Sequence, residues 1–436
     1  MKIECWEQIL NKKICVEHPK RESTRCLMNQ NLLSPFNSLE KNSHYPDLMT
    51  NEFLELNEKI SRYSFNSCLT LRSHLVRECF FNHSILTLMS GDNMKSYLMK
   101  RLGSSIVGLM MLLLFPLHTS AETLMVYTAV EAEDLKRYAA AFNKDHPDIK
   151  IRWVRDSTGI VTAKLLAEKN NPRADVIWGL AATSLMLLKS EGMLQPYSPK
   201  GVDKLDPKFR DAANPPSWTG MDAWIAAVCV NTVEAERHNL PTPTSWMDLT
   251  DPVYKGYLVM PNPNSSGTGF LDVSSWLQLY GPLGGWQYMD NLHENIAWYT
   301  HSGSKPCKQA ARGETPIGIS FAFRGAKSKA AGAPLDIVLP REGVGWDMEA
   351  TAIVKGTKKL SAAQKLVDWS ITRKANELYN QGYAVVAYPG VAKPVKHFPE
   401  GILEAMIDND FEFAAVNRKS ILSEWQNRYD AKSEAK

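Results

Sequence analysis

Three short segments rich in glycine and small hydroxyl residues carry the first chemistry that this sequence suggests. They are DSTG at 156–159, GLAAT at 179–183 and NSSGTG at 264–269, and each precedes a predicted helix. Glycine lets the backbone approach a ligand, and hydroxyls and helix N-terminal amides donate hydrogen bonds to anions. Together the segments predict a phosphate or phosphonate site. For any one of them, a simple turn or N-cap role is the alternative.

A second segment, REGVGWDME at 341–349, places two carboxylates beside a tryptophan. Asp347 and Glu349 could hold an ammonium group by charge pairing, and Trp346 could add a cation–π contact. The alternative is a hinge or a surface turn with solvated acids. Ser302, in the segment SGS at 302–304, and Arg324 are further candidates for the same cleft, although Arg324 could equally be a surface charge.

Catalytic and cofactor motifs do not accompany these segments. The sequence has no G-x-S-x-G elbow and no H-E-x-x-H pair, and no lysine follows the second glycine of 264–269 as a Walker motif would require. We therefore expect no enzyme activity, no cofactor and no metal. Cys229 and Cys307 either form one disulfide or remain two buried thiols.

Alternating strand and helix patterns must position the candidate segments. Apolar runs at 124–127, 149–153 and 174–178 predict strands, and residues 131–143 and 158–170 have helical spacing. Further strands are expected at 224–230, 257–260, 317–321 and 335–339, with a helical region at 273–292 that Gly281 and Pro282 interrupt. This alternation predicts an α/β fold with a parallel sheet, in which ligands bind beyond the carboxyl ends of the strands.

Composition separates the chain into two parts. The net charge is only +3 over 436 residues, which argues against a nucleic-acid or acidic-membrane partner. Five of the seven cysteines fall within residues 1–93, at Cys5, Cys15, Cys26, Cys68 and Cys79. That spacing fits no zinc pattern. Because a secretory signal begins after them, the first 93 residues are expected to be an upstream or disordered extension.

Residues 94–121 read as a secretory signal. Lys95, Lys100 and Arg101 supply a basic start, 106–117 an apolar core, and 119–121 a cleavage site of small residues. The core is too short for a spanning helix, which needs about 20 residues. The mature protein is then expected to run from Glu122 to Lys436 in the periplasm. A cytoplasmic extension followed by a short signal anchor is the alternative.

Four stretches of this expected mature chain together resemble a known family. ETLMVYTAVE at 122–131, LLAEKNNPRADVIWG at 165–179, PTSWMDLTDPVYKG at 243–256 and the SSGTG loop are similar to type II periplasmic solute-binding proteins of ABC transporters. Within them the sequence resembles the 2-aminoethylphosphonate-binding branch. The resemblance implies two α/β lobes around a ligand cleft, joined by crossing strands near Val228 and at 350–354. Lobe one would hold 122–230 and 350–436, and lobe two 231–349.

The resemblance also implies which residues surround the ligand. The anionic head would contact hydroxyl and small residues, namely Thr128, Ser157, Thr158, Ala182, Thr183, Ser265, Ser266, Gly267 and Thr268. The amine end would contact acidic and aromatic residues, namely Glu131, Trp178, Trp346, Asp347 and Glu349.

One departure from the wider family bears on the ligand. Ferric-binding relatives carry an adjacent tyrosine pair where this chain has Ser320-Phe321-Ala322-Phe323-Arg324, and phenylalanine cannot bind iron. The expected function is reversible capture of a small phosphonate such as 2-aminoethylphosphonate by a monomer that delivers it to permease subunits. A sugar phosphate or another phosphate ester is the alternative within the class. A polyamine and ferric iron rank lower, and a phosphoester- or phosphonate-processing enzyme is the alternative of a different class.

Overall fold

The computed structural model describes residues 121–435 of the chain. The segment 1–93 and all but the last residue of the expected signal peptide at 94–121 lie outside the described residues. Within 121–435, no helix is long and apolar enough to cross a membrane.

Eleven strands in the described chain share one continuous sheet. Their bounds are β1 Glu122–Thr128, β2 Ile149–Arg155, β3 Val176–Ala181, β4 Leu194–Gln195, β5 Thr219–Asn231, β6 Leu258–Pro261, β7 Ile296–Thr300, β8 Ile317–Phe321, β9 Leu335–Val338, β10 Trp346–Val354 and β11 Val385–Val386. Neighbouring strands follow the order β2-β1-β3-β10-β5-β8-β6-β7, and the three short strands β4, β9 and β11 pair with β10 or β5.

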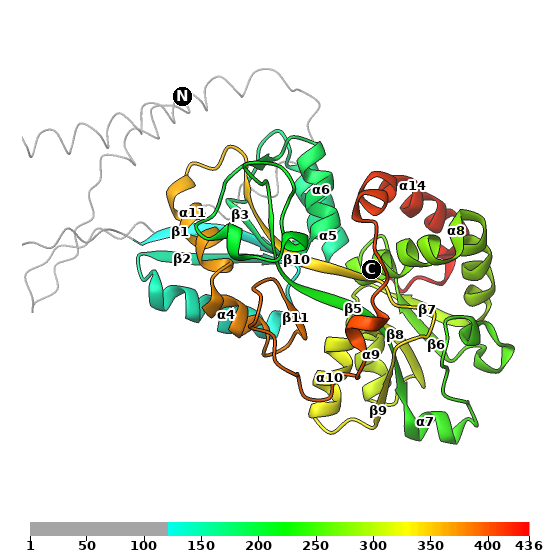
Figure 1. Cartoon of the computed structure of the whole chain (residues 1–436). Coiled ribbons are helices and arrows are strands. Elements are labelled where there is room, and N and C mark those ends of the chain that lie inside the picture. The colour runs from blue at the N-terminus through cyan, green and yellow to red at the C-terminus, as the bar shows by residue number, and fades with distance from the viewer. Residues whose placement is uncertain (1–120, 436) are drawn as a thin grey trace, which may run out of the picture. The chain divides into compact units, whose positions relative to one another are not determined.

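Helices flank this sheet at both ends (Figure 1). Their bounds are α4 Ala132–Asp145, α5 Thr158–Ala167, α6 Ala182–Ser190, α7 Thr232–Arg237, α8 Gly267–Asn295, α9 Lys305–Ala311, α10 Ala322–Ala330, α11 Leu360–Ser370, α12 Arg373–Tyr379, α13 Ile402–Ala405 and α14 Phe411–Tyr429. Helix α8 is broken at Gly281, whose φ of 73° only glycine adopts readily, just before Pro282. The interruption expected from the sequence therefore lies where the structure has it.

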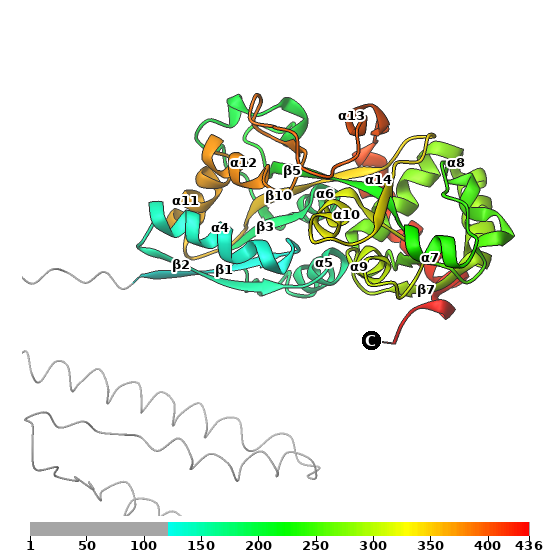
Figure 2. The same cartoon turned by 90° about the horizontal axis from the view of Figure 1, so that it is seen from below.

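The long strand β5 divides the sheet into two halves, which we call lobe one and lobe two. Its first half pairs with β10 and β11 in lobe one, and its second half, from Ala226 onward, pairs with β8 and β9 in lobe two. Beside this point the amide of Ala226 donates to the carbonyl oxygen of Gly345, at 2.9 Å. Figure 2 shows β5 and β10 running together between the two lobes.

The crossing points differ from those expected from the sequence. Residues 350–354 do not cross, because they pair with β3 and β4 inside lobe one. The chain returns to lobe one earlier, at Gly345–Trp346, and β5 changes partners at Ile225–Ala226 rather than at Val228. Both strands are buried along their whole length, so burial alone does not mark where a strand exchanges one set of partners for another.

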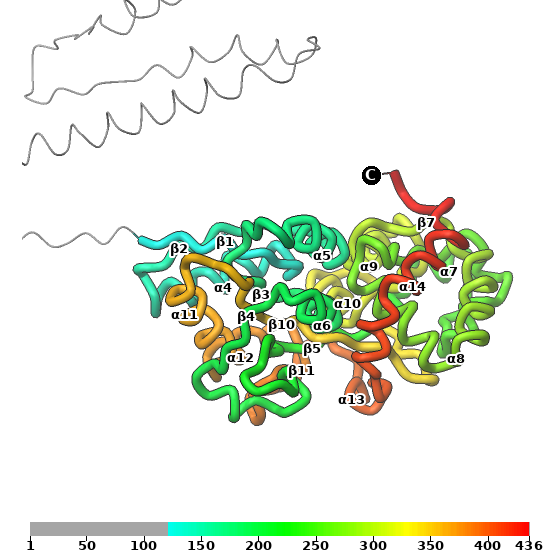
Figure 3. Tube along the Cα trace, turned by 90° about the horizontal axis from the view of Figure 1, so that it is seen from above, coloured from blue at the N-terminus to red at the C-terminus, as the bar shows by residue number. Residues whose placement is uncertain are grey.

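The C-terminal segment also differs from the expectation that 350–436 belongs wholly to lobe one. Helix α14 packs on α6 of lobe one and on α8 of lobe two, as its course in Figure 3 shows. Val344 and Met406 form a parallel bridge, and Tyr299 and Ser433 form another beside β7. The last 35 described residues thus connect the lobes a third time.

Each lobe has its own packing centre. In lobe one, Trp178 lies among Tyr138, Trp153 and Trp369, with ring centroids 5.4–5.9 Å apart. In lobe two, Cys229 of β5 and Cys307 of α9 form a disulfide and are fully buried. Of the two alternatives left open by the sequence, the structure has the disulfide.

Candidate ligand-binding site

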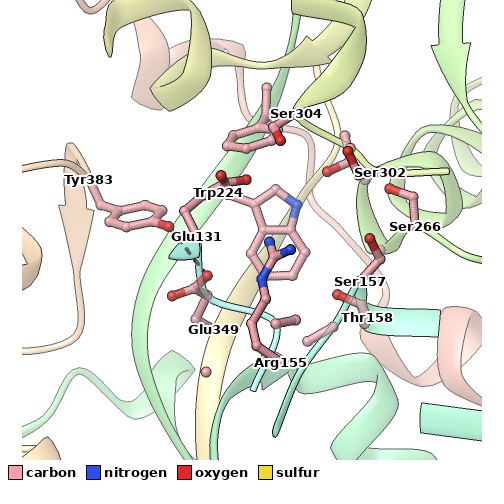
Figure 4. A pocket seen from close by; sticks show the side chains of 17 residues that line it. Glu131, Arg155, Ser157, Thr158, Trp224, Ser266, Ser302, Ser304, Glu349 and Tyr383 are labelled. Carbon is pink, nitrogen blue, oxygen red and sulfur yellow. Dashed lines mark hydrogen bonds between the residues drawn. The ribbon is translucent and has the colours of Figure 1, made fainter. Parts of the chain in front are cut away.

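A pocket opens where strand-end loops of both lobes face each other beside β5 and β10 (Figure 4). It is lined by Ala129, Glu131, Arg155, Ser157, Thr158, Gly179, Ala181, Trp224, Ser266, Gly267, Thr268, Ser302, Gly303, Ser304, Phe321, Glu349 and Tyr383. In the close view, Ser157, Thr158, Ser266 and Ser302 gather on one side, whereas Glu131, Glu349 and Tyr383 lie on the other. We call these the hydroxyl end and the acidic end.

The hydroxyl end is built from the first residues of two helices, one from each lobe. Helix α5 begins at Thr158 and helix α8 begins at Gly267, so both present N-terminal amides near the same point. The two starts are joined by a backbone hydrogen bond from the amide of Gly159 to the carbonyl oxygen of Ser265, at 2.9 Å. Unpaired amides and the positive end of the helix dipole favour an anion at such a position.

Glycine is required at this junction by lack of space. A Cβ atom on Gly267 would lie 2.5 Å from the hydroxyl oxygen of Thr158, which no real contact tolerates. A Cβ on Gly303 would collide with the side chain of Thr268 in the same way. Any side chain at these positions would push the loops apart and enlarge or distort the hydroxyl end.

Arg155 supplies a positive charge to the pocket. It ends strand β2, directly before the loop that carries Ser157, and its Nε donates to the carbonyl oxygen of Val130 at 3.1 Å. That bond leaves the other guanidinium nitrogens available, and Figure 4 shows the group directed between the hydroxyl and acidic ends. Charged donors of this kind form the stronger class of hydrogen bonds to a phosphate.

The acidic end contains two buried carboxylates in different surroundings. Glu131 accepts a hydrogen bond from Arg324 at 2.6 Å and lies 3.5 Å from Lys308, so its charge is matched by cations of lobe two. Glu349 accepts only the hydroxyl of Tyr383, at 3.3 Å, among the described residues. Burial, together with the nearby carboxylates Asp134 and Glu131, raises the pKa of Glu349 to about 8.

Ion pairs next to the acidic end connect the lobes. Arg324 and Lys327 of α10 reach Glu133 of α4 at 2.8 and 3.0 Å, beside the Arg324–Glu131 pair. Burial acts to raise the pKa of Glu133, but the hydrogen bonds from Arg324 and Lys327 outweigh it and hold that pKa at about 2. The cluster favours the arrangement in which the two lobes touch.

Half of the sixteen candidates from the sequence line this pocket. They are Glu131, Ser157, Thr158, Ser266, Gly267, Thr268, Ser302 and Glu349. The other eight lie outside the lining: Thr128, Trp178, Ala182, Thr183, Ser265, Arg324, Trp346 and Asp347.

Most of these eight are occupied by contacts within the protein. Trp178 lies in the aromatic core of lobe one and donates from Nε1 to the hydroxyl of Tyr379 at 3.3 Å. Thr128 accepts the amide of Val130, and Ser265 donates to the carbonyl oxygen of His301. Arg324 is paired with Glu131, just before α4, and with Glu133 of α4. These residues therefore support the structure around the pocket but do not line it.

The other residues outside the lining are held by contacts at α6 and in the C-terminal segment. Asp347 accepts the hydroxyl of Thr183 at 2.7 Å, and burial raises the pKa of Asp347 to about 6. Trp346 donates to the carbonyl oxygen of Ile407 at 2.9 Å and packs on Phe411. Ala182 is fully buried beside Thr183 at the start of α6. Of the predicted pair Asp347–Glu349, only Glu349 reaches the pocket.

Several lining residues were not among the candidates. Arg155 stands one residue before a segment that was chosen, so the end of its strand was the available signal. Gly179 and Ala181 lie in the segment 179–183, and Gly303 and Ser304 lie in the segment 302–304, both of which were chosen from the sequence. Trp224 and Tyr383 lie in apolar or helix-flanking stretches that are typical of a core, and nothing local distinguishes them. Phe321 lies in the stretch 320–324 that was compared with the tyrosine pair of ferric-binding relatives, which was the available signal.

Comparisons with known proteins agree with this architecture. The sequence profile of the family described as bacterial extracellular solute-binding protein matches residues 171–412. An uncharacterized protein of Haemophilus influenzae is 31% identical over 311 residues, which is 69% of this chain and 89% of that protein. A probable ABC-transporter periplasmic-binding protein of Sinorhizobium fredii is 27% identical over 57% of this chain and 69% of its own length.

Solved structures match the described fold as well. The periplasmic binding protein AfuA of Actinobacillus pleuropneumoniae, with fructose 6-phosphate bound, is 31% identical with a TM-score of 0.67 and covers 71% of this chain and 99% of its own. The ferric ion-binding protein A of Pasteurella haemolytica is 18% identical with a TM-score of 0.59, over 72% of this chain and all of its own, and shares the fold.

These matches establish the type II periplasmic-binding-protein fold and a binding role rather than a catalytic one. They also establish that the protein binds a small ligand and acts together with the permease of a transporter. The chain belongs to the bacterial extracellular solute-binding proteins, as a periplasmic component of an ABC transporter.

Proposed function

We propose that this protein captures a small molecule through a phosphate or phosphonate group held at the hydroxyl end of the pocket. The observation that carries the proposal is the meeting of two helix starts from different lobes, at Ser157–Thr158 and Ser266–Thr268, beside the guanidinium of Arg155. Backbone amides, hydroxyls and one arginine match the several acceptor oxygens of such a group.

The remainder of the ligand would extend toward Trp224 and the acidic end. AfuA, which is 31% identical to this chain, binds fructose 6-phosphate, and this supports a sugar phosphate as the first candidate. The indole of Trp224 lines this part of the pocket. Such a surface suits a compact ring with hydroxyl groups.

2-Aminoethylphosphonate is the second candidate, because a glutamate at the acidic end could pair with its ammonium. That pairing would need a carboxylate that is not already paired, whereas Glu131 is already paired with Arg324. Ferric iron ranks lowest. Within the described chain, no group of three or more histidine, cysteine, aspartate or glutamate side chains is placed to hold a metal, and the stretch 320–324 contains no tyrosine.

Thermal unfolding of the purified protein against a ligand panel tests this proposal. The panel comprises fructose 6-phosphate, glucose 6-phosphate, 2-aminoethylphosphonate, inorganic phosphate, putrescine and ferric citrate. A bound ligand at a hundredfold excess over its Kd stabilises the fold by about 2.7 kcal/mol, an easily measured shift. We expect shifts only with phosphorylated or phosphonate compounds. A shift with putrescine or ferric citrate alone would contradict the proposal.

A further inference from the structure

An aromatic contact joins the two lobes at the acidic end of the pocket. Phe323, in the first turn of α10 in lobe two, stacks on Tyr383, which lies between α12 and β11 in lobe one. The ring centroids are 4.7 Å apart, and the ring planes differ by 17°. Both side chains are buried, with exposed fractions of 4% and 2%. Tyr383 lines the pocket, whereas Phe323 does not.

The backbone beside Tyr383 leaves room for the ring of Phe323 only because residue 382 is glycine. A Cβ atom on Gly382 would lie 2.6 Å from a ring carbon of Phe323, closer than real Cβ contacts come. The amide of Tyr383 donates to the carbonyl oxygen of Tyr379 at 3.0 Å, and its carbonyl oxygen accepts from Asn380 at 2.9 Å. The segment is therefore held within lobe one and shaped to receive a side chain of lobe two.

Phe323 also contacts the ion-pair cluster between the lobes. The guanidinium carbon of Arg324 lies 5.5 Å from its ring centroid and the ammonium of Lys327 5.2 Å, within the range of cation–π attraction. The same two cations pair with Glu131 and Glu133 of lobe one. One ring thus packs against both the charged and the aromatic contacts that α10 makes with lobe one.

Tyr383 extends this contact into the pocket. Its hydroxyl donates to Oε1 of Glu349 at 3.3 Å, and within 121–435 the Glu349 carboxylate accepts no other hydrogen bond. Figure 4 shows both side chains at the acidic end. The hydroxyl oxygen of a tyrosine lies on the ring axis, so its position is set by the backbone and by χ1. A ring stacked against Phe323 restrains χ1, and the partner of Glu349 therefore depends on a residue of lobe two.

The stretch 320–324 thereby has a role that its comparison with ferric-binding relatives did not suggest. Phe321 lines the pocket, and its ring centroid lies 6.1 Å from that of Phe323. Arg324, the next residue, pairs with Glu131 at 2.6 Å. Three of the five residues therefore line the pocket or contact a residue that does.

We propose that Phe323 is a positioning residue of the binding site, which acts by holding the Tyr383 hydroxyl on Glu349. Once it has donated to Glu349, the Tyr383 oxygen can still accept a hydrogen bond, which suits a donor group of the ligand. That donor is a hydroxyl of a sugar phosphate or the ammonium of 2-aminoethylphosphonate. This inference rests on the proposed function, because it concerns the part of the ligand that lies beyond the phosphoryl or phosphonate group.

The inference predicts a change in the ratio of two affinities. Inorganic phosphate contacts the hydroxyl end alone, whereas a larger ligand also reaches the acidic end. A weaker contact between the lobes lowers both affinities alike, so their ratio reports on the position of Tyr383. A purely structural role of Phe323 would leave this ratio unchanged.

The experiment measures binding to wild type, Phe323→Leu, Tyr383→Leu, the double variant and Phe142→Leu by isothermal titration calorimetry. Fructose 6-phosphate, 2-aminoethylphosphonate and inorganic phosphate are the ligands. Leucine stays apolar but has no ring to stack. Phe142→Leu is the matched control, because Phe142 is fully buried against Trp369 within lobe one and does not line the pocket. Circular dichroism establishes that each variant is folded.

We expect Phe323→Leu to lower the affinity for the tighter-binding of the two larger ligands about tenfold relative to phosphate. Tyr383→Leu should change the ratio by at least as much, and the double variant no further, because either substitution removes the same contact. Phe142→Leu should lower the Tm and keep the ratio within about twofold. An unchanged ratio in Phe323→Leu, or independent effects that multiply in the double variant, would overturn the inference.

Nuclear magnetic resonance of carbon-13-labelled tyrosine rings tests the contact itself. The signals of Tyr383 are identified by their absence in Tyr383→Leu. They should shift in Phe323→Leu, where the ring current of Phe323 is lost, and stay in place in Phe142→Leu. Tyr383 signals that do not move in Phe323→Leu would also overturn the inference.

Inorganic phosphate separates this inference from the proposed function. If neither phosphate nor either larger compound binds to wild type, the proposed function fails and the inference fails with it. If they bind and the ratio stays fixed in Phe323→Leu, only the role of Phe323 is refuted.

Discussion

The two ends of the pocket are made in different ways. The hydroxyl end consists of short loops that begin helices, and its chemistry depends on backbone amides and small side chains within 157–158 and 266–268. The acidic end depends on Glu131, Glu349 and Tyr383, which come from separate parts of the chain. The charge and hydrogen bonding of these side chains depend on neighbouring groups that do not line the pocket.

This difference separates binding strength from selectivity. Hydroxyl and amide donors fixed by helix starts recognise any tetrahedral oxyanion, and two glutamates with different partners can discriminate what is attached to it. Glu131 is held by Arg324, whereas Glu349 faces Asp222 without a cation of its own beyond Arg155. Changes at the hydroxyl end should therefore weaken every phosphorylated ligand, and changes at the acidic end should alter the order of preference.

The largest effect is expected from closing the hydroxyl end sterically. Gly267→Val would place carbon atoms against Thr158. We expect the resulting strain to be about 3 kcal/mol, which corresponds to roughly a 100-fold loss of affinity. Calorimetry with fructose 6-phosphate and inorganic phosphate measures it. The control is Ala331→Val, at an exposed position after α10. Undiminished phosphate affinity in Gly267→Val would show that the head group binds elsewhere.

Removing the pocket arginine should have the next largest effect. Arg155→Ala deletes charged hydrogen bonds worth about 1.5–3 kcal/mol, so we expect a loss of roughly 10- to 100-fold for every phosphorylated ligand. Arg152→Ala is the matched control, because Arg152 is exposed on the same strand and does not line the pocket. Equal losses in the two variants would mean that general charge, not the site, attracts the ligand.

The sequence predicted the hydroxyl end better than the acidic end. Ser157, Thr158 and Ser266–Thr268 follow strands directly, so local patterns are enough to bring them to the sheet edge. Trp346, Asp347 and Glu349 also lie together in the sequence, but only Glu349 lines the pocket. Trp346 points to the opposite face of β10. Asp347 shares the face of Glu349, but its carboxylate accepts the hydroxyl of Thr183, a contact that the local pattern does not reveal.

Long-range pairing explains the other differences. The α/β class follows from alternating patterns. The expected parallel sheet is mixed, because β10 pairs antiparallel with β3 and β5, and the exchange of partners at Ala226 depends on contacts with β8, β9 and β10 that are remote in sequence. Tyr383 and Trp224 look like core residues in the sequence because they are largely buried; their remaining exposure is to the pocket.

A smaller effect is expected from loosening the contact between the lobes. Arg324→Met removes the ion pairs with Glu131 and Glu133 while keeping an unbranched apolar stem, and we expect affinity to fall by about tenfold because touching lobes are favoured less. Small-angle scattering should show a larger radius of gyration. Lys329→Met on the same helix, where Lys329 pairs only with Asp336, should change neither quantity. An unchanged radius of gyration in Arg324→Met would show that these ion pairs do not hold the lobes together.

The disulfide should matter least for ligand binding. Cys229 and Cys307 are separated by 78 residues and do not line the pocket, so their bond constrains lobe two. Reduction should cost about 2–4 kcal/mol of stability, visible as a lower Tm, while the affinity of the folded protein stays within about twofold. A large loss of affinity with an unchanged Tm would instead connect the disulfide to the pocket.

The most direct test of the phosphoryl site is calorimetry with fructose 6-phosphate, fructose and inorganic phosphate on the wild-type protein. The account predicts binding of both phosphate-bearing compounds, with fructose at least about 100-fold weaker than its phosphate, since the hydroxyl end supplies most of the interactions. Fructose binding as tightly as fructose 6-phosphate, or no binding by either phosphate compound, would contradict the claim that this pocket captures a phosphoryl group.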